Sequence, residues 1–243
     1  VAKAWQKKKA DAGWACLHWP KEYGGRGSSP IERVIWQQEE GPFGKLSGIF
    51  IIGHGMCGPT MMAFAGEEEK RKYLPPLASG EKVWCQLFSE PAGGSDVAGL
   101  RTRAEKKGDD WIINGQKIWT SGAHYSDYGI LLTRTDPNVA KHKGLTMFFL
   151  DMKSPGVEVR PIKQANGMQE FNEVYFTNVR FLKEIKQDTK SRTQLKHLLI
   201  LLPRILAVIL LVLAFAQPLH KRDVRRAHAS DGGGRRLGGS PAH

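Results

Sequence analysis

The hydrophobic pattern of the sequence changes its period near residue 83, and this change limits the fold more than any other feature. Before it, residues 31–40 carry apolar side chains at helical spacing, directly after a proline suited to a first helical turn. Residues 67–74 are rich in helix formers, and the two prolines that follow predict the end of that helix. Residues 48–64 are apolar with interspersed glycines, which indicates a buried helix in close contact with its neighbours. Residues 1–82 are therefore predicted to be helical.

Short strands are predicted from residue 83 to residue 180. Residues 110–119 predict a strand, an Asn-Gly hairpin turn and a return strand. Apolar or alternating runs predict further strands at residues 128–133, 145–151, 156–161 and 172–176. Short strands at this close spacing are typical of a small barrel or sandwich.

A glycine-rich turn over residues 88–96 ends in a hydroxyl and a carboxylate, those of Ser95 and Asp96, and Trp119 follows Ser95 by 24 residues. Adjacent glycines let backbone N–H groups approach phosphate oxygens, and an aromatic ring packs well against a flat ring system. Together these features indicate a site for a large planar cofactor with a pyrophosphate tail. Taken singly, each feature is weak, and the residues alone favour a turn cap for Ser95 and Asp96 and a core aromatic for Trp119.

The charge distribution argues against a nucleic-acid-binding protein. The net charge is +12, of which residues 1–180 contribute +4 and residues 181–243 contribute +8. The basic residues therefore gather in the tail, where they flank an apolar run. Cys16, Cys57 and Cys85 are far apart, and neither they nor the histidines have the spacing of a metal site, so we expect small buried cysteines. No signal peptide is evident, and the missing initiator methionine indicates that the chain begins inside a longer protein.

Residues 198–216 form a 19-residue apolar window interrupted only by Pro203 and Arg204. Its fourteen Leu, Ile, Val and Phe residues favour membrane insertion by about 4 to 8 kcal/mol in total, against a cost of about 3 kcal/mol for one arginine. The window is long enough to span a bilayer, so we predict a membrane helix, with a buried helix or a core strand as the alternative. Basic residues flank both ends, which leaves the orientation open.

Five segments of the sequence closely resemble the acyl-CoA dehydrogenase family, and the resemblance runs from about residue 5 to about residue 180. The matching segments are residues 14–25, 73–81, 89–96, 114–122 and 170–176. The family implies a helical N-terminal domain, a β-barrel middle domain and a helical C-terminal domain. The first is placed at residues 1–82, truncated at its start, and the second at residues 83–180, whereas the third is not recognisable. The predicted fold class is therefore α+β and multidomain, with a helical domain, a β-barrel and a C-terminal transmembrane helix.

The resemblance implies FAD as the cofactor, with two stretches of the chain on either side of the flavin. The implied contacts, in chain order, are Leu87, Phe88, Ser89, Gly94, Ser95, Trp119, Thr120 and Ser121. The first three would lie at the pyrimidine edge, the glycine and serine of the turn beside the phosphate-bearing arm, and the last three on the other side. Ser121 would lie near the hydride-accepting N5, and Ser95 would also touch the pantetheine part of the substrate. Family members often carry threonine at positions 89 and 121, and serine keeps that hydroxyl.

The implied reaction is the α,β-dehydrogenation of an acyl-CoA thioester, in which a base removes the α-proton and the flavin accepts the β-hydride. In the family the base is usually a glutamate of the C-terminal domain, so no catalytic residue is assigned in this sequence. The implied partners are an acyl-CoA substrate, an electron-transferring flavoprotein or similar acceptor and, for the intact enzyme, further copies in a homo-oligomer. The implied location is the cytoplasm. A non-catalytic FAD- or acyl-CoA-binding fragment fused to a membrane anchor is the alternative.

The tail has a resemblance of its own. Residues 178–186, 195–199 and 213–218 are similar to bacterial aerotolerance-regulator membrane proteins, in which this stretch leads into a transmembrane helix. Residues 181–219 are accordingly interpreted as a basic linker and membrane helix, and the Gly-rich residues 220–243 as a low-complexity, disordered end. The chain is then a hybrid, either through a gene fusion that places it at a membrane or through an error in assembling the sequence.

Overall fold

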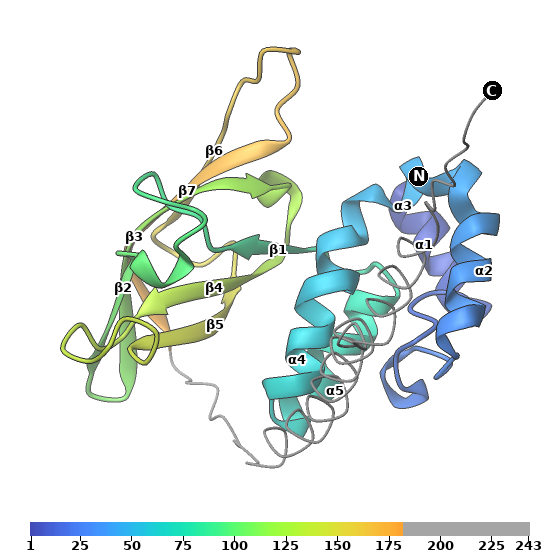
Figure 1. Ribbon diagram of the computed structural model, residues 1–243, viewed down its shortest axis with the longest axis horizontal. Helices are drawn as coiled ribbons and strands as arrows, with labels where there is room; N and C mark the ends of the chain where they lie inside the picture. Colours follow the sequence, from blue (N-terminus) through green and yellow to red (C-terminus); the bar gives the residue numbers. More distant parts are fainter. Residues whose placement is uncertain (182–243) are drawn as a thin grey trace, which may run out of the picture. The chain divides into compact units, whose positions relative to one another are not determined.

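Helices occupy the first part of the chain and strands the second (Figure 1). The computed structural model describes residues 1–181, which lie within one compact unit, Val1–Thr189. The helices are α1 (Ala2–Asp11), α2 (Pro30–Glu40), α3 (Gly44–Ser47), α4 (Gly58–Phe64) and α5 (Glu67–Ala78), joined by short helical turns. The prediction that residues 1–82 are helical is confirmed.

The predicted membrane segment, residues 198–216, lies outside the described residues, as does the low-complexity end. Within residues 1–181, no single helix has both the length and the apolar character to cross a membrane. The bent pair Pro30–Phe50 and Gly53–Phe64, with 78° between its halves, meets these two criteria only when taken together.

Helix α2 begins at a complete capping box. The Ser29 hydroxyl accepts a hydrogen bond from the backbone N–H of Glu32 at 3.4 Å, and the Glu32 carboxylate accepts one from the Ser29 N–H at 2.7 Å. Pro30 occupies the first turn, where a backbone N–H would have no helical partner. The box satisfies backbone donors that a helix end otherwise leaves unpaired, which explains why the helix begins where the sequence predicts.

Replacing Ser29 by alanine is expected to lower the free energy of unfolding by about 1 kcal/mol, because the substitution removes the capping hydroxyl. The measurement is urea denaturation followed by circular dichroism. Ser28→Ala, one residue outside the cap, is the matched control. Equal losses in the two variants would show that the cap does not stabilise the start of α2.

Helix α5 does not end at Leu74, as the sequence predicts, but continues through Pro75 and Pro76. The fixed φ of proline is compatible with a helix, and these prolines lie near the end, where their carbonyl groups still accept hydrogen bonds. The Ser79 N–H donates to Pro75 O at 3.0 Å. Leu74 and Leu77 are fully buried, so the packing of this turn outweighs the missing proline N–H groups.

The predicted helix over residues 48–64 is divided into a 3₁₀ turn, Gly48–Phe50, a π-helical turn, Gly53–Cys57, and α4. It is buried on one side only, and Phe64 on the other side is 58% exposed. The expected close contact is confirmed at Gly58, where a Cβ atom would lie 2.1 Å from the ring of Trp19.

Seven strands form one mixed sheet in the order β1-β4-β2-β3-β7-β6, with β5 paired to β4. They are β1 (Trp84–Leu87), β2 (Arg103–Lys107), β3 (Asp110–Ser121), β4 (Tyr128–Arg134), β5 (Leu145–Asp151), β6 (Val157–Pro161) and β7 (Phe171–Phe181). The strands predicted at β4, β5, β6 and β7 are confirmed, although β7 is longer than expected. Strand β1 runs parallel to β4, whereas β5 runs antiparallel to it. No pairing within residues 1–181 joins β6 to β1 or β5, so the expected barrel is observed as a sheet around one core, without closure by hydrogen bonds.

The predicted Asn-Gly hairpin turn is wrong, because Asn114 and Gly115 lie inside the continuous strand β3. The turn falls instead after Lys107, which pairs with Asp110 at the end of the β2–β3 ladder. Gly115 has a φ of +150°, and a Cβ atom there would lie 2.6 Å from the Thr102 hydroxyl oxygen. The glycine therefore serves a register shift against β7 and a close approach to a neighbouring strand.

Two hydrophobic clusters form the core of the described chain. One lies within the sheet and contains Trp111, Phe148 and Val174 among its buried residues. The other joins the helical part to the sheet, since buried residues from positions 16–78 pack against Trp84, Ile130 and Phe149. The two family-like parts of the chain therefore share one of their cores.

All three cysteines are buried and free, as the sequence predicts. Burial raises the pKa of Cys16 and of Cys85 to about 12. Their thiols therefore stay protonated near neutral pH, which suits a packing role.

Candidate functional site

The glycine-rich turn begins where β1 ends, and the predicted residues along it become steadily more exposed. They run from the fully buried Leu87, through the half-buried Phe88 and Ser89, to the exposed Gly94 and Ser95. Between them the backbones of Glu90 and Gly93 exchange two hydrogen bonds, of 3.1 and 3.0 Å. The chain folds back tightly at this point, as the sequence predicts.

Trp119 points away from the core. Its φ of +59° is rare for a bulky residue, and it lies in a register shift of β3 against β7 between Lys117 and Thr120. The indole is 57% exposed, and its ring centroid lies 6.2 Å from that of Phe171 in an edge-to-face arrangement. The interpretation of Trp119 as a core aromatic is therefore wrong. Thr120 is buried and its Oγ1 has no hydrogen-bond partner within residues 1–181, whereas Ser121 is half-buried.

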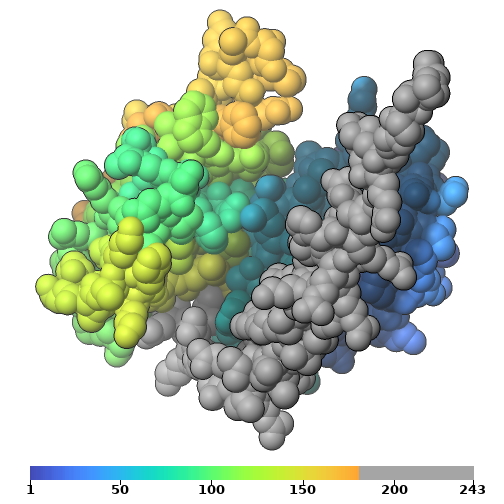
Figure 2. Space-filling view, in the orientation of Figure 1, coloured from blue at the N-terminus to red at the C-terminus, as the bar shows by residue number. Residues whose placement is uncertain are grey.

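The Trp119 bulge lies beside a prominent part of the sheet. Phe171 is the first residue of β7, directly after the connection from β6 that protrudes in Figures 1 and 2. Gly122 donates its N–H to Glu170 O at 2.8 Å, which ties the end of β3 to this connection. The exposed indole therefore packs on one side against Phe171, next to a connection that is hydrogen-bonded to the end of β3.

The structure brings the two predicted stretches together. The Ile118 N–H donates to Ser89 O at 2.9 Å, and Lys117 Nζ donates to Phe88 O at 3.1 Å. Ile118, which precedes Trp119 in the chain, is therefore hydrogen-bonded to the start of the turn. The exposed glycine end of the turn makes no hydrogen bond to the Trp119 bulge within residues 1–181, so the structure joins only the first half of the turn to it.

A buried ion pair lies at the base of the turn. Lys117 Nζ and Glu90 Oε1 are 2.8 Å apart, and the two side chains are 0% and 6% exposed. The Glu90 carboxylate also accepts the backbone N–H groups of Arg101 and Thr102, at 2.6 and 2.9 Å. The carboxylate therefore has three donors, and the ion pair is almost fully enclosed by the fold.

Sequence reasoning missed this pair, although the sequence contained a signal. Lys117 continues the inward-facing alternation of Trp111 and Ile113 along β3, and a charge at such a position indicates a buried partner. Burial alone would raise the pKa of Glu90, but hydrogen bonds from Lys117 and Thr102 outweigh it and hold this pKa below its usual value. Burial lowers the pKa of Lys117, and the nearby carboxylate opposes that shift.

The far end of the turn is tied to the segment after β4. Asp96 Oδ2 and Lys141 Nζ lie 2.9 Å apart, and this hydrogen bond lowers the pKa of Asp96. The Arg134 guanidinium donates to Ala98 O at 2.5 Å and to Leu100 O at 3.3 Å. Both ends of the turn are therefore held by the sheet, and its glycines lie between two fixed points.

The residues at this place fit a flat ligand with polar edges and a phosphate arm. The hydroxyls of Ser89 and Ser121 make no hydrogen bond within residues 1–181, so they are available to a ligand. A Cβ atom at Gly93 would meet nothing within 4 Å, and one at Gly94 would meet only Ser89, at 3.6 Å. The turn backbone is therefore open to close approach by phosphate oxygens, and the exposed Trp119 offers a ring surface. This donor set suits FAD.

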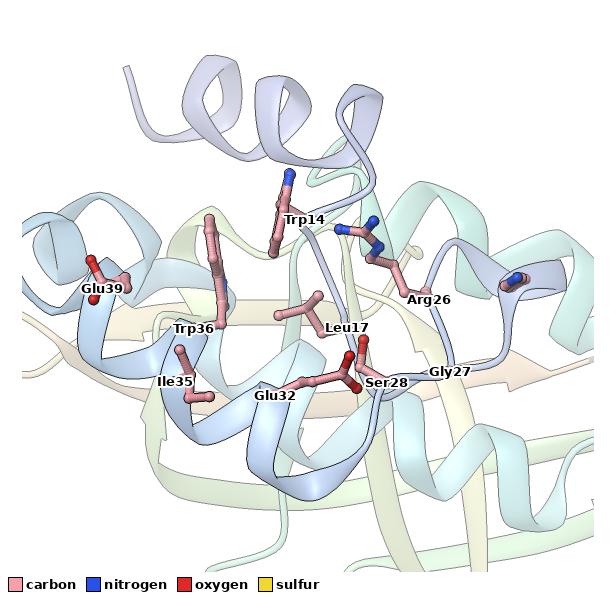
Figure 3. A pocket seen from close by; sticks show the side chains of 11 residues that line it. Trp14, Leu17, Arg26, Gly27, Ser28, Glu32, Ile35, Trp36 and Glu39 are labelled. Carbon is pink, nitrogen blue, oxygen red and sulfur yellow. The ribbon is translucent and has the colours of Figure 1, made fainter.

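A large cavity lies elsewhere, between α2 and the loop before it (Figure 3). Its volume is about 920 Å³, and Trp14 stacks on Trp36 in its wall with 4.7 Å between ring centroids. The Arg26 guanidinium lies 4.3 Å from the centroid of the Trp14 ring. None of the predicted site residues lines this cavity. We place the candidate site at the turn, because the turn carries the free hydroxyls, the open backbone and the exposed ring.

Three family models match the sequence. Acyl-CoA dehydrogenase, N-terminal domain, matches residues 1–81, and Acyl-CoA dehydrogenase, middle domain, matches residues 85–179. Aerotolerance regulator N-terminal matches residues 168–218 and overlaps the middle-domain match over residues 168–179. The two resemblances found in the sequence are thereby confirmed.

Curated relatives carry the same family name. Acyl-CoA dehydrogenase IpdE1 of Mycobacterium tuberculosis is 42% identical over 178 residues, which is 73% of this chain and 46% of the relative. Acyl-CoA dehydrogenase FadE34 of the same organism is 44% identical over 170 residues, or 70% of this chain and 24% of the relative. Mitochondrial isovaleryl-CoA dehydrogenase of Pongo abelii is 33% identical over 158 residues, or 63% of this chain and 37% of the relative. The chain thus spans about half or less of the length of these relatives.

Solved structures show the same fold. The ChsE4-ChsE5 complex from Mycobacterium tuberculosis is similar with a TM-score of 0.68 and 32% identity, over 81% of this chain and 51% of that chain. A glutaryl-CoA dehydrogenase from Mycobacterium smegmatis in complex with FADH2 is similar with a TM-score of 0.63 and 25% identity, over 77% of this chain and 48% of that chain.

Proposed function

Residues 1–81 and 85–179 belong to the acyl-CoA dehydrogenase family, and on this premise we propose that the chain binds FAD between the glycine-rich turn and the Trp119 bulge. The observation that carries the proposal is the meeting of these two stretches. The 2.9 Å hydrogen bond between the Ile118 N–H and Ser89 O holds the turn beside a tryptophan whose ring is 57% exposed. An exposed ring held by a bulge, joined through Ile118 and Ser89 to a turn whose glycine backbone is open, is the arrangement that a planar cofactor with a phosphate arm requires.

When bound, FAD supplies the ring that accepts the hydride, and the residues of this chain bind and orient it. The residues proposed to hold it are Leu87, Phe88, Ser89, Gly94, Ser95, Trp119, Thr120 and Ser121. The Ser121 hydroxyl would donate a hydrogen bond near the hydride-accepting N5, and the indole of Trp119 would pack beside the ring. Ser95 would hold the phosphate-bearing arm and also contact the pantetheine part of the substrate.

The proposed reaction is the α,β-dehydrogenation of an acyl-CoA thioester, which needs a base at the α-carbon. The two carboxylates of the turn, those of Glu90 and Asp96, are engaged by Lys117 and Lys141. Neither is free to act as that base. We therefore assign the base to the part of the relatives that this chain does not match, and no catalytic residue to residues 1–181.

The proposed partners follow from the same reaction. They are an acyl-CoA substrate, an electron-transferring flavoprotein or similar acceptor, and further subunits, as the ChsE4-ChsE5 complex of a relative suggests. A membrane location depends on residues 198–216, which stay a prediction.

Trp119→Ala is expected to weaken FAD binding about tenfold, because it removes the ring that packs on the flavin. The measurement is the dissociation constant from quenching of flavin fluorescence. Trp14→Ala is the matched control, because Trp14 is also partly exposed, at 40%, but lines the cavity beside α2. Equal weakening in both variants, or no binding by the unaltered chain, would contradict the proposed site.

A non-catalytic FAD- or acyl-CoA-binding fragment is the second candidate, favoured by the ion pairs that engage both carboxylates of the turn. Turnover of acyl-CoA with an artificial electron acceptor separates the two. Saturable flavin binding without turnover supports the fragment, whereas turnover supports the enzyme.

A further inference from the structure

Glu90 is the junction between the two ends of the glycine-rich turn. Its Oε1 accepts from Lys117 Nζ at 2.8 Å and from the Thr102 N–H at 2.9 Å, and its Oε2 accepts from the Arg101 N–H at 2.6 Å. The same Nζ donates to Phe88 O at 3.1 Å. The ion pair therefore connects Phe88, the first residue of the turn, with strand β3 and with Arg101 and Thr102, which follow the turn.

The ion pair also reaches the other side of the candidate site. Lys117 precedes Trp119 by two residues, and the register shift that turns the indole outward begins at Lys117. The residue between them, Ile118, donates its N–H to Ser89 O at 2.9 Å. The position of the turn backbone relative to the exposed indole is therefore set within three consecutive residues of β3.

Stability alone does not account for a charged pair at this place. The attraction in a buried ion pair is largely cancelled by the cost of removing both charges from water, and apolar side chains of similar size often stabilise a core as well. Three buried residues of the same sheet, Ile113, Val174 and Val179, are apolar. What the pair adds is geometry, because each charge must keep its partner and every further hydrogen bond has a fixed direction.

We infer that Glu90 and Lys117 are positioning residues that hold the Phe88–Ser89 backbone against the Trp119 bulge and thereby set the affinity of the chain for FAD. Both side chains are almost fully enclosed, so they act through the turn rather than by touching the cofactor. The part of this inference that concerns FAD rests on the proposed function.

The first test is Lys117→Met, compared with Lys9→Met in the full chain. Lys9 is a matched control, because its Nζ lies 2.5 Å from Glu40 Oε1 and the two side chains are only 8% and 16% exposed. Both variants leave a largely buried carboxylate without its cation, so both are expected to lower the unfolding temperature. Only Lys117→Met is expected to raise the FAD dissociation constant, by about tenfold or more. Only this variant is expected to speed amide hydrogen exchange in residues 88–102 and 118–121.

A double variant, Glu90→Gln with Lys117→Met, guards against a mere failure to fold. It leaves no unpaired charge, so it is expected to regain most of the unfolding temperature while FAD affinity stays weak. If the double variant recovers both the unfolding temperature and the FAD affinity, the ion pair has only a structural role. The same conclusion follows if Lys9→Met and Lys117→Met lose FAD affinity equally. If the unaltered chain binds no FAD, the proposed function and the affinity part fail together. The exchange comparison then still decides whether the pair positions the turn.

Discussion

Trp84→Ala is expected to lower the free energy of unfolding by about 3 to 5 kcal/mol, the range for loss of a large buried aromatic side chain. Trp84 is 1% exposed and begins β1. Its ring lies edge-to-face with those of Tyr73 and Phe149, at 5.5 and 5.6 Å between centroids, and tilted against Tyr128 at 5.1 Å. These partners come from α5, β4 and β5, so the substitution opens a cavity in the core shared by helices and sheet.

The measurement is urea denaturation combined with hydrogen exchange, and Trp111→Ala is the control. Trp111 is buried in the cluster within the sheet, so its loss is expected to speed exchange in the sheet but not in α5. Trp84→Ala is expected to speed exchange in both. Trp84→Phe should cost much less, because it keeps a ring and removes an indole N–H that has no partner within residues 1–181. If hydrogen exchange in α5 is unchanged in Trp84→Ala, Trp84 does not join the helices to the sheet.

Lowering the pH from 6.5 to 4 is expected to remove roughly 3 kcal/mol of stability through His54. Burial lowers the pKa of His54 from 6.5 to about 4, although the hydrogen bond to Leu77 O, of 2.8 Å, opposes the shift. Above pH 6.5 the ring is neutral in both states, and stability is unaffected. Below it the unfolded chain binds the proton first, so stability falls until the folded ring is also protonated near pH 4.

The measurement is the free energy of unfolding at pH 7 and pH 4 for the unaltered chain and for His54→Asn. Other groups also reduce the stability of the protein in acid, and Glu90 is one of them, because its pKa is lowered in the folded chain. Its contribution to stability is present above the unfolded pKa and is lost as the pH falls through the folded pKa. The difference between the two proteins isolates His54. An identical loss between pH 7 and pH 4 in both would exclude His54 as its source.

Local signals in the sequence predicted the elements whose ends depend on neighbouring residues. The proline at position 30 marked the first turn of α2, and the apolar runs of β4 and β5 match the buried positions of these strands. The Asn-Gly pair failed because its conformation depends on Thr102 in the neighbouring strand rather than on the turn preference of the two residues. The end of α5 failed because the burial of Leu77 outweighs the local signal of the prolines.

The candidate site also combines features that local sequence signals predict with features that depend on distant residues. The tight turn follows from its glycines, and the sequence placed it correctly. The exposure of Trp119 depends on a register shift against β7, whose residues lie about 50 positions later, so no local pattern contains it. The partner of Lys117 is 27 residues away and becomes visible only once the sheet has formed.

The core shared by helices and sheet also constrains how the chain is made. Residues from positions 16–78 leave the ribosome first, but their cluster is complete only when Ile130 and Phe149 have followed. Synthesis from Trp84 to Phe149 takes roughly 3 to 13 seconds at typical rates. During that time the apolar side of the helices has no sheet to cover it. The boundary near residue 83 therefore divides two domains of one sequence family without dividing two independent folding events.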